Sequence, residues 1–171
     1  ADVAKLQDQL TGALVGLARS VAGGNVPTAD TDKTMLSGLF TTITNVNFNS
    51  STIQAMIDEV HARKDMLSPG CTACGSPCGQ NDDYDMNEVW NANEDIRSLK
   101  SLILFGLRGM AAYAYHAMVL GYTDADVNEF FYRAMFVIGY EDTMEALLPM
   151  VLKTGEVNLK CMALLDKANT Q

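Results

Sequence analysis

Three cysteines in one glycine-rich stretch have the spacing best suited to chemistry. Cys71, Cys74 and Cys78 form a Cys-x2-Cys-x3-Cys pattern that glycines and a proline flank. Thiolates at this spacing can hold one tetrahedral metal ion, or three corners of an iron-sulfur cluster, because a glycine-rich backbone folds around the ion. A fourth ligand is missing locally, so it would come from another part of the chain. The candidates for this fourth ligand are Cys161, His61 and Asp82.

Other uses of these cysteines stay open, because the same thiols could remain free or form an adventitious disulfide. The two histidines, His61 and His116, lack the Glu-x-x-His spacing of di-iron helical bundles. The sequence also lacks a Gly-x-Gly-x-x-Gly motif, a Walker loop and a serine nucleophile elbow. We therefore predict no catalytic residue, and we expect no cofactor in this chain beyond a possible metal at the cysteine stretch.

The elements that must position these residues are helices. Apolar residues recur every three or four positions along most of the chain, and no period-two strand pattern occurs. We predict an all-α fold of two consecutive three-helix bundles, joined by a long loop that carries the cysteines and several glycines. The first helical group spans 1–67, the irregular connection 68–93, and the second group 94–171, with a long central helix over 95–120.

Helix ends are predicted from short polar residues and from glycine or proline. Gly23 and Gly24, followed by Pro27, should end the first helix. Asn93 should cap the long helix. Two capping boxes are predicted elsewhere, one formed by Ser51 with Gln54 and the other by Thr123 with Asp126.

Several residues inside the second group carry packing predictions. The consecutive apolar residues 102–105 point all around the long helix, so we expect it to be buried on most sides. Gly106 and Gly109 each cost about 1 kcal/mol relative to alanine, which close approach of a neighbouring helix would explain. Pro149 should kink or divide the following helix, and Gly155 should separate it from the last one.

Charge and composition exclude some partners. The formal net charge is −9, and lysine and arginine form no stripe, so nucleic-acid binding has little electrostatic support. Charged residues interrupt the longest apolar stretches before they could cross a bilayer, and the N-terminus lacks the pattern of a secretion signal. We therefore expect a cytoplasmic protein that binds neither nucleic acid nor membrane.

Three separated runs resemble the N-terminal helical domain of hybrid cluster proteins, the family also called hydroxylamine reductase. They are LFTTITNVNF at 39–48, LRGMAAYA at 107–114 together with His116, and KTGEVNLK at 153–160. The ending LLDKANT at 164–170 is similar to the point where that family's first domain meets its second. The resemblance covers nearly the whole chain apart from the stretch between Ser68 and Asn93, and carbon monoxide dehydrogenases are a more distant structural relative.

The resemblance implies a cytoplasmic parent enzyme that reduces hydroxylamine or nitric oxide. That family uses an iron-sulfur cubane near the N-terminus and an iron-sulfur-oxygen hybrid cluster between later domains. This chain matches neither ligand set, because the family's cubane cysteines precede the segment similar to 1–17, and no cysteine here occurs before Cys71. The resemblance therefore assigns no catalytic residue to this sequence.

These observations lead to one main expectation and two alternatives. The main expectation is a non-catalytic helical domain or fragment, with a structural and assembly role and no reductase activity alone. Helix faces that would contact the remaining domains of the parent should then be exposed, and we expect them to drive self-association into a symmetric dimer. The alternatives are a small metal-binding or iron-sulfur redox protein that uses Cys71, Cys74 and Cys78, and a helical adaptor.

Overall fold

The computed structural model describes residues 3–43, 49–67 and 83–170 of the chain. Within these ranges every regular element is a helix and no strand occurs, which confirms the predicted all-α class. The helices are α1 (Val3–Ala22), α2 (Ala29–Thr41), α3 (Ser50–Leu67), α4 (Asn87–Trp90), α5 (Glu94–Val119), α6 (Ala125–Tyr140) and α7 (Met144–Asn169).

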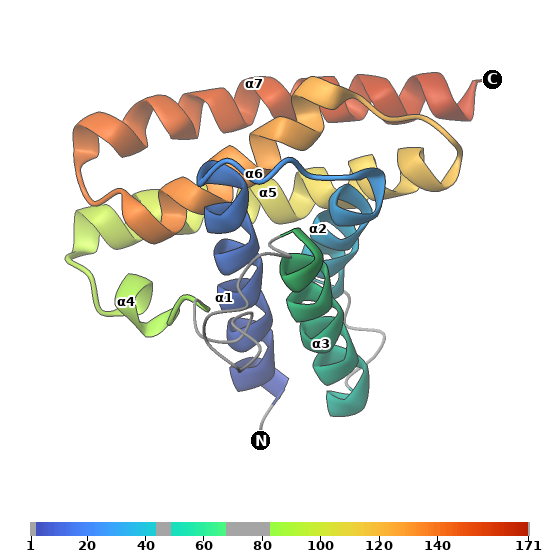
Figure 1. The fold of residues 1–171 in the computed structure, drawn as a ribbon. Helices are drawn as coiled ribbons and strands as arrows, with labels where there is room; N and C mark the ends of the chain where they lie inside the picture. The colour runs from blue at the N-terminus through green and yellow to red at the C-terminus, as the bar shows by residue number, and fades with distance from the viewer. Residues whose placement is uncertain (1–2, 44–48, 68–82, 171) are drawn as a thin grey trace.

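Figure 1 shows two directions of helix packing. The long helices α5 and α7 lie side by side, with α6 between them in the chain, while α1 and α3 run across this direction. The middle of α1 is fully buried, because it contacts α3 on one side and α6 on another. Helix α2 lies against both α3 and α5 and so connects the first helices to the last ones. The short helix α4 lies within the stretch 68–93 that the sequence predicts to be irregular.

The helix ends follow the predicted chemistry, although two of the caps lie at different residues. Helix α1 ends before Gly23 as predicted, and the Asn93 Oδ1 accepts from the Ile96 N–H at 3.0 Å. The capping box predicted at Ser51 is wrong, because Asn49 caps α3 by accepting from the Ser51 N–H at 3.1 Å. The box predicted at Thr123 is also wrong: the carboxylate of Asp124 caps α6. In both cases a short polar side chain nearer the helix start accepts the unpaired N–H groups.

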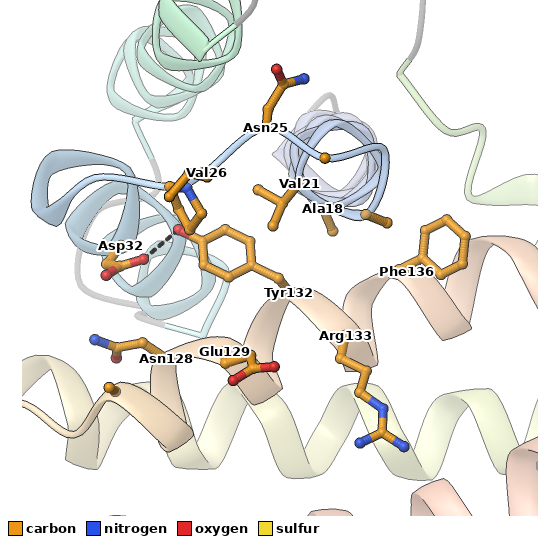
Figure 2. Close-up of a pocket in the computed structure, with 14 residues that line it drawn as sticks. Ala18, Val21, Asn25, Val26, Asp32, Asn128, Glu129, Tyr132, Arg133 and Phe136 are labelled. Carbon is orange, nitrogen blue, oxygen red and sulfur yellow. Dashed lines mark hydrogen bonds between the residues drawn. The ribbon is translucent and has the colours of Figure 1, made fainter.

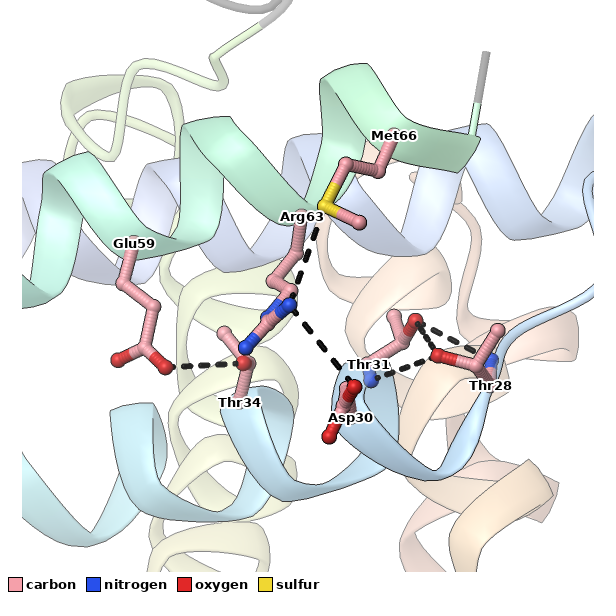
Figure 3. A network of polar contacts seen from close by, with 7 residues as sticks. All are labelled: Thr28, Asp30, Thr31, Thr34, Glu59, Arg63 and Met66. Carbon is pink, nitrogen blue, oxygen red and sulfur yellow. Dashed lines mark hydrogen bonds and ion pairs between the residues drawn. The ribbon is translucent and has the colours of Figure 1, made fainter. Parts of the chain in front are cut away.

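Helices α2 and α3 are joined by a polar network that Figure 3 shows. Thr28 and Thr31 form a reciprocal capping box at the start of α2. Thr34 donates to the Glu59 carboxylate at 3.4 Å, and Arg63 lies 4.0 Å from the Asp30 carboxylate. These contacts lie at the edge of the apolar core and fix how α3 sits on α2.

Helix α5 is buried on one side only, so the expectation of burial on most sides is wrong. Ile103 and Leu104 are buried, whereas Leu102 is 55% exposed and Phe105 is 79% exposed. Within the part of the chain described, α5 alone is long and apolar enough to cross a membrane by length and composition, a test that core helices of soluble proteins also pass. The expectation that charged residues interrupt the longest apolar stretches is therefore wrong for α5.

Helix α7 continues without a break through Pro149 and Gly155, so the predicted division of this segment is wrong. Pro149 is exposed in the second turn, where its ring removes one backbone hydrogen bond of the helix. The predicted close approach is confirmed at Gly106, where an added Cβ would lie 2.6 Å from the Thr154 Cγ2. The same prediction is wrong for Gly109, because nothing lies within 4 Å of the position that its Cβ would take.

Candidate functional site

The candidate metal ligands are not brought together by the described residues. Cys71, Cys74, Cys78 and Asp82 lie outside the described ranges. Cys161 is fully buried in α7, where burial and then the charge of Asp124 raise the pKa of its thiol to about 12. Both effects disfavour the thiolate, which is the form that binds a metal ion.

His61 lies where the cysteine-bearing stretch ends. Its Nε2 is 2.7 Å from the Oδ2 of Asp83, the first described residue after that stretch. The two side chains are 15% and 30% exposed, so both are partly buried. A carboxylate that holds one imidazole nitrogen orients the ring, and such carboxylate–histidine pairs often support metal ligands.

The described residues do not supply a ligand set for an iron-sulfur cluster. Within 3–43, 49–67 and 83–170, no group of three or more His, Cys, Asp or Glu side chains is arranged to hold a metal ion. His61 and Asp83 contact each other as a pair and do not form such a group.

Tyr84 anchors the residues that follow the cysteine-bearing stretch. Its backbone N–H donates to the Gly12 carbonyl of α1 at 3.0 Å, and its ring lies 5.8 Å from the Tyr140 ring of α6. Burial and then the charge of Glu88 raise the pKa of the Tyr84 hydroxyl to about 12, so it stays protonated. This anchor was not predicted from the sequence, where its local signal is a glycine, Gly12, inside the apolar run of α1.

Two further side chains tie distant helices to α1. The Trp90 Nε1–H donates to the Asp8 carboxylate at 3.0 Å, which holds α4 against α1. Arg108 of α5 donates to the Thr42 hydroxyl at 3.0 Å and to the Thr11 hydroxyl at 3.3 Å. Burial lowers the pKa of this guanidinium, although its pKa stays far above neutral pH because arginine starts so high. Arg108 lies in one of the runs that resemble hybrid cluster proteins, and here it joins three helices.

A cavity of about 630 Å³ lies between the end of α1, the 23–27 turn and α6. Its walls are mainly apolar, and Figure 2 shows Tyr132 at its centre with the hydroxyl directed at Asp32. The Tyr132 hydroxyl donates to the Asp32 Oδ1 at 2.6 Å. Burial raises the pKa of Asp32, while hydrogen bonds from Tyr132 and Asn128 oppose this shift. Neither residue was singled out from the sequence, because nothing local marks an aspartate that a distant helix will cover.

This carboxyl should make the stability of the fold depend on pH. Because the pKa of Asp32 is raised in the folded state, the folded chain keeps a proton at pH values where the unfolded chain has released it. The contribution of Asp32 to the free energy of unfolding is therefore fully present below pH 3.8 and is lost as the pH rises through the folded-state pKa. We expect Asp32→Asn to keep an acceptor for Tyr132 and to flatten this dependence. Urea unfolding across this pH range checks the result, with Asp58→Asn on the exposed side of α3 as control. An unchanged slope for Asp32→Asn would contradict the assignment.

A broad apolar surface lies on α5 and α7, which we call the α5–α7 apolar face. It consists of Leu102 and Phe105 of α5 with Met144, Leu148, Leu152, Leu159 and Met162 of α7. Leu152 is 76% exposed and Leu159 is 66% exposed, so large apolar side chains are exposed to water along α7 from Met144 to Met162. Contiguous exposed apolar patches of several hundred Å² are uncommon on monomeric proteins and usually mark an interaction site.

Comparison with known proteins shows to which protein family this helical chain belongs. A sequence profile of the Prismane/CO dehydrogenase family matches residues 1–171, and the chain belongs to that family. Hydroxylamine reductase of Acetivibrio thermocellus is 38% identical over 99% of this chain and 34% of its own length. Those of Solidesulfovibrio magneticus and Methanococcus vannielii are 37% and 33% identical, over 99% of this chain and 35% of their own length.

These similarities confirm the resemblance to hybrid cluster proteins that the sequence runs indicated. They also show how much of each relative is matched: the chain spans about a third of the length of the relatives it matches. The chain is thus similar to one part of a hydroxylamine reductase.

Proposed function

We propose that the chain is a non-catalytic helical part of a longer hydroxylamine reductase-type protein, with a structural and assembly role. The α5–α7 apolar face carries this proposal, because it is a surface that a neighbouring part of a larger protein would cover. The relatives provide such a neighbour, since about two thirds of their length lies outside the matched region. The chain alone then has no reductase activity. Without its neighbour the α5–α7 apolar face would be left in water, so the chain associates with itself.

The proposal is tested with the purified chain. Under anaerobic conditions with reduced methyl viologen as electron donor, hydroxylamine should be consumed no faster than in a protein-free blank. The full-length Acetivibrio thermocellus enzyme serves as the positive control. Light scattering at micromolar concentration should give the mass of two chains. Hydroxylamine reduction by the chain alone would contradict the non-catalytic role, and a monomer at all concentrations would contradict the self-association.

A second candidate function is a small metal-binding or iron-sulfur redox protein that uses Cys71, Cys74 and Cys78. The observation that favours it is the His61–Asp83 pair beside the end of the cysteine-bearing stretch. Anaerobic reconstitution with iron and sulfide, followed by a visible spectrum and metal analysis, tests it. A bound cluster should be lost in Cys74→Ser, whereas a colourless, metal-free and folded protein would rule this function out.

The proposed location is the cytoplasm, and neither nucleic acid nor a membrane is a proposed partner. The acidic net charge of −9 supports the first exclusion, since it repels phosphate backbones. The packing of α5 against four other helices supports the second, because it covers one side of the helix that is apolar enough to enter a bilayer.

A further inference from the structure

We infer that a second copy of this chain docks on the α5–α7 apolar face with the two α7 helices antiparallel, so that Leu152 of each copy packs over the partner's Gly155. This inference rests on the self-association part of the proposed function. It adds the surface, the orientation and the register of the contact.

The first supporting observation is the alignment of the exposed apolar residues of α7. They recur every three or four positions, which places them on one side of the helix. The run is Met144, Leu148, Leu152, Gly155, Leu159 and Met162, all of them exposed. Glycine inside a helix costs about 1 kcal/mol relative to alanine, and nothing lies within 4 Å of the position that a Gly155 Cβ would take. The glycine therefore leaves a depression in an otherwise bulky stripe.

The second observation is that this stripe complements itself when reversed. An antiparallel alignment that sets Leu148 opposite the partner's Leu159 also brings Met144 to within one residue, about 1.5 Å along the axis, of the partner's Met162. The same alignment sets Leu152, the most exposed apolar residue of α7, opposite the partner's Gly155. A two-fold axis repeats each contact, so both glycine depressions receive a leucine.

The charges beside the apolar residues of α7 and the area of the α5–α7 apolar face both fit a second copy of the chain as the partner. Glu145 and Lys160 are exposed on the same edge of the stripe, and the antiparallel alignment brings each carboxylate beside the partner's ammonium. Because Gly106 has no side chain, α5 lies close to Thr154 of α7. The exposed Phe105 and Leu102 of α5 therefore extend the apolar surface that the exposed residues of α7 form. The apolar side chains of this face together expose an area on the order of the ~800 Å² that each partner contributes to a standard interface.

The first experiment measures dimer dissociation by sedimentation or light scattering over a dilution series. Leu152→Ser should raise the dissociation constant at least tenfold, and Gly155→Leu should do the same by filling the depression. Val26→Ser is the matched control, because Val26 is 81% exposed but lies in the turn after α1, away from this face; it should change the constant less than twofold. A dimer that is insensitive to Leu152→Ser would overturn the inference.

The second experiment tests the register. Leu152→Cys chains are mixed with Gly155→Cys chains, oxidised mildly and mapped by peptide mass spectrometry, which separates this link from any made by the native cysteines. A disulfide between positions 152 and 155 supports the inference. Dimers without this link would overturn the register while the proposed self-association stands, and a monomer would overturn both. Binding to neutral phosphatidylcholine vesicles that Leu152→Ser abolishes would make a bilayer the occupant and would also overturn it.

Discussion

Replacing Gly12 by alanine should lower the free energy of unfolding by about 3 kcal/mol, near the upper end for overpacking a core. The Cβ of an alanine would overlap the Tyr84 carbonyl oxygen, and this neighbour is backbone that cannot rotate away. The Tyr84 segment would have to leave α1, which would also break the hydrogen bond between the Tyr84 N–H and the Gly12 carbonyl. The contact of the Tyr84 ring with Gly139 of α6 would be disturbed as well.

Urea unfolding followed by circular dichroism measures this effect. Gly109→Ala is the matched control, because Gly109 also lies inside a helix but has open space beside it. There alanine should raise the free energy of unfolding by about 0.5–1 kcal/mol, as expected from helix propensity alone. A loss below 1 kcal/mol for Gly12→Ala would show that the segment after the cysteine stretch is not held against α1.

Removing the carboxylate of Asp142 should cost about 2 kcal/mol, because it leaves a buried ammonium without a partner. The Lys100 side chain is 1% exposed, and its Nζ donates to the Asp142 Oδ1 at 2.8 Å. This contact holds the turn between α6 and α7 against the start of α5. The Asp142 side chain is 77% exposed, so water screens part of the interaction and the cost stays below that of a fully buried pair.

The comparison of three variants separates this effect from a general loss of charge. Asp142→Ala should be destabilising, while Lys100→Met should be nearly neutral because it removes the buried charge together with the need for a partner. Glu156→Ala breaks the exposed pair with Lys153 and should cost less than about 0.5 kcal/mol. Equal losses for Asp142→Ala and Lys100→Met, measured by urea unfolding, would contradict this account.

Helix positions could be predicted because their signals are local. The spacing of apolar residues located α1 and α5, the glycines before Pro27 marked the end of α1, and Asn93 marked the start of α5. Caps were misplaced at α3 and α6 because several short polar residues compete there, and the backbone selects the one with the right geometry. The break expected at Pro149 does not occur, since packing of α7 against α5 outweighs the loss of one exposed hydrogen bond.

The candidate site was predictable only in part. The spacing of the cysteines is visible in the sequence, and the family membership suggested by three short runs is confirmed. Neither the contact between His61 and Asp83 nor that between Tyr84 and Gly12 could be predicted, because each joins segments that lie far apart in the chain. The pairing of Asp32 with Tyr132 was missed for the same reason.

The sequence by itself determined that this protein is helical, where most of its helices lie and to which family it belongs. All three depend on residue type and on spacing along the chain. The tertiary structure decided which side of each helix is covered. Four consecutive apolar residues of α5 look alike in sequence, yet Ile103 and Leu104 are buried while Leu102 and Phe105 stand in water. Burial depends on which distant helix packs against each side, and the spacing of residues within one helix does not contain that information.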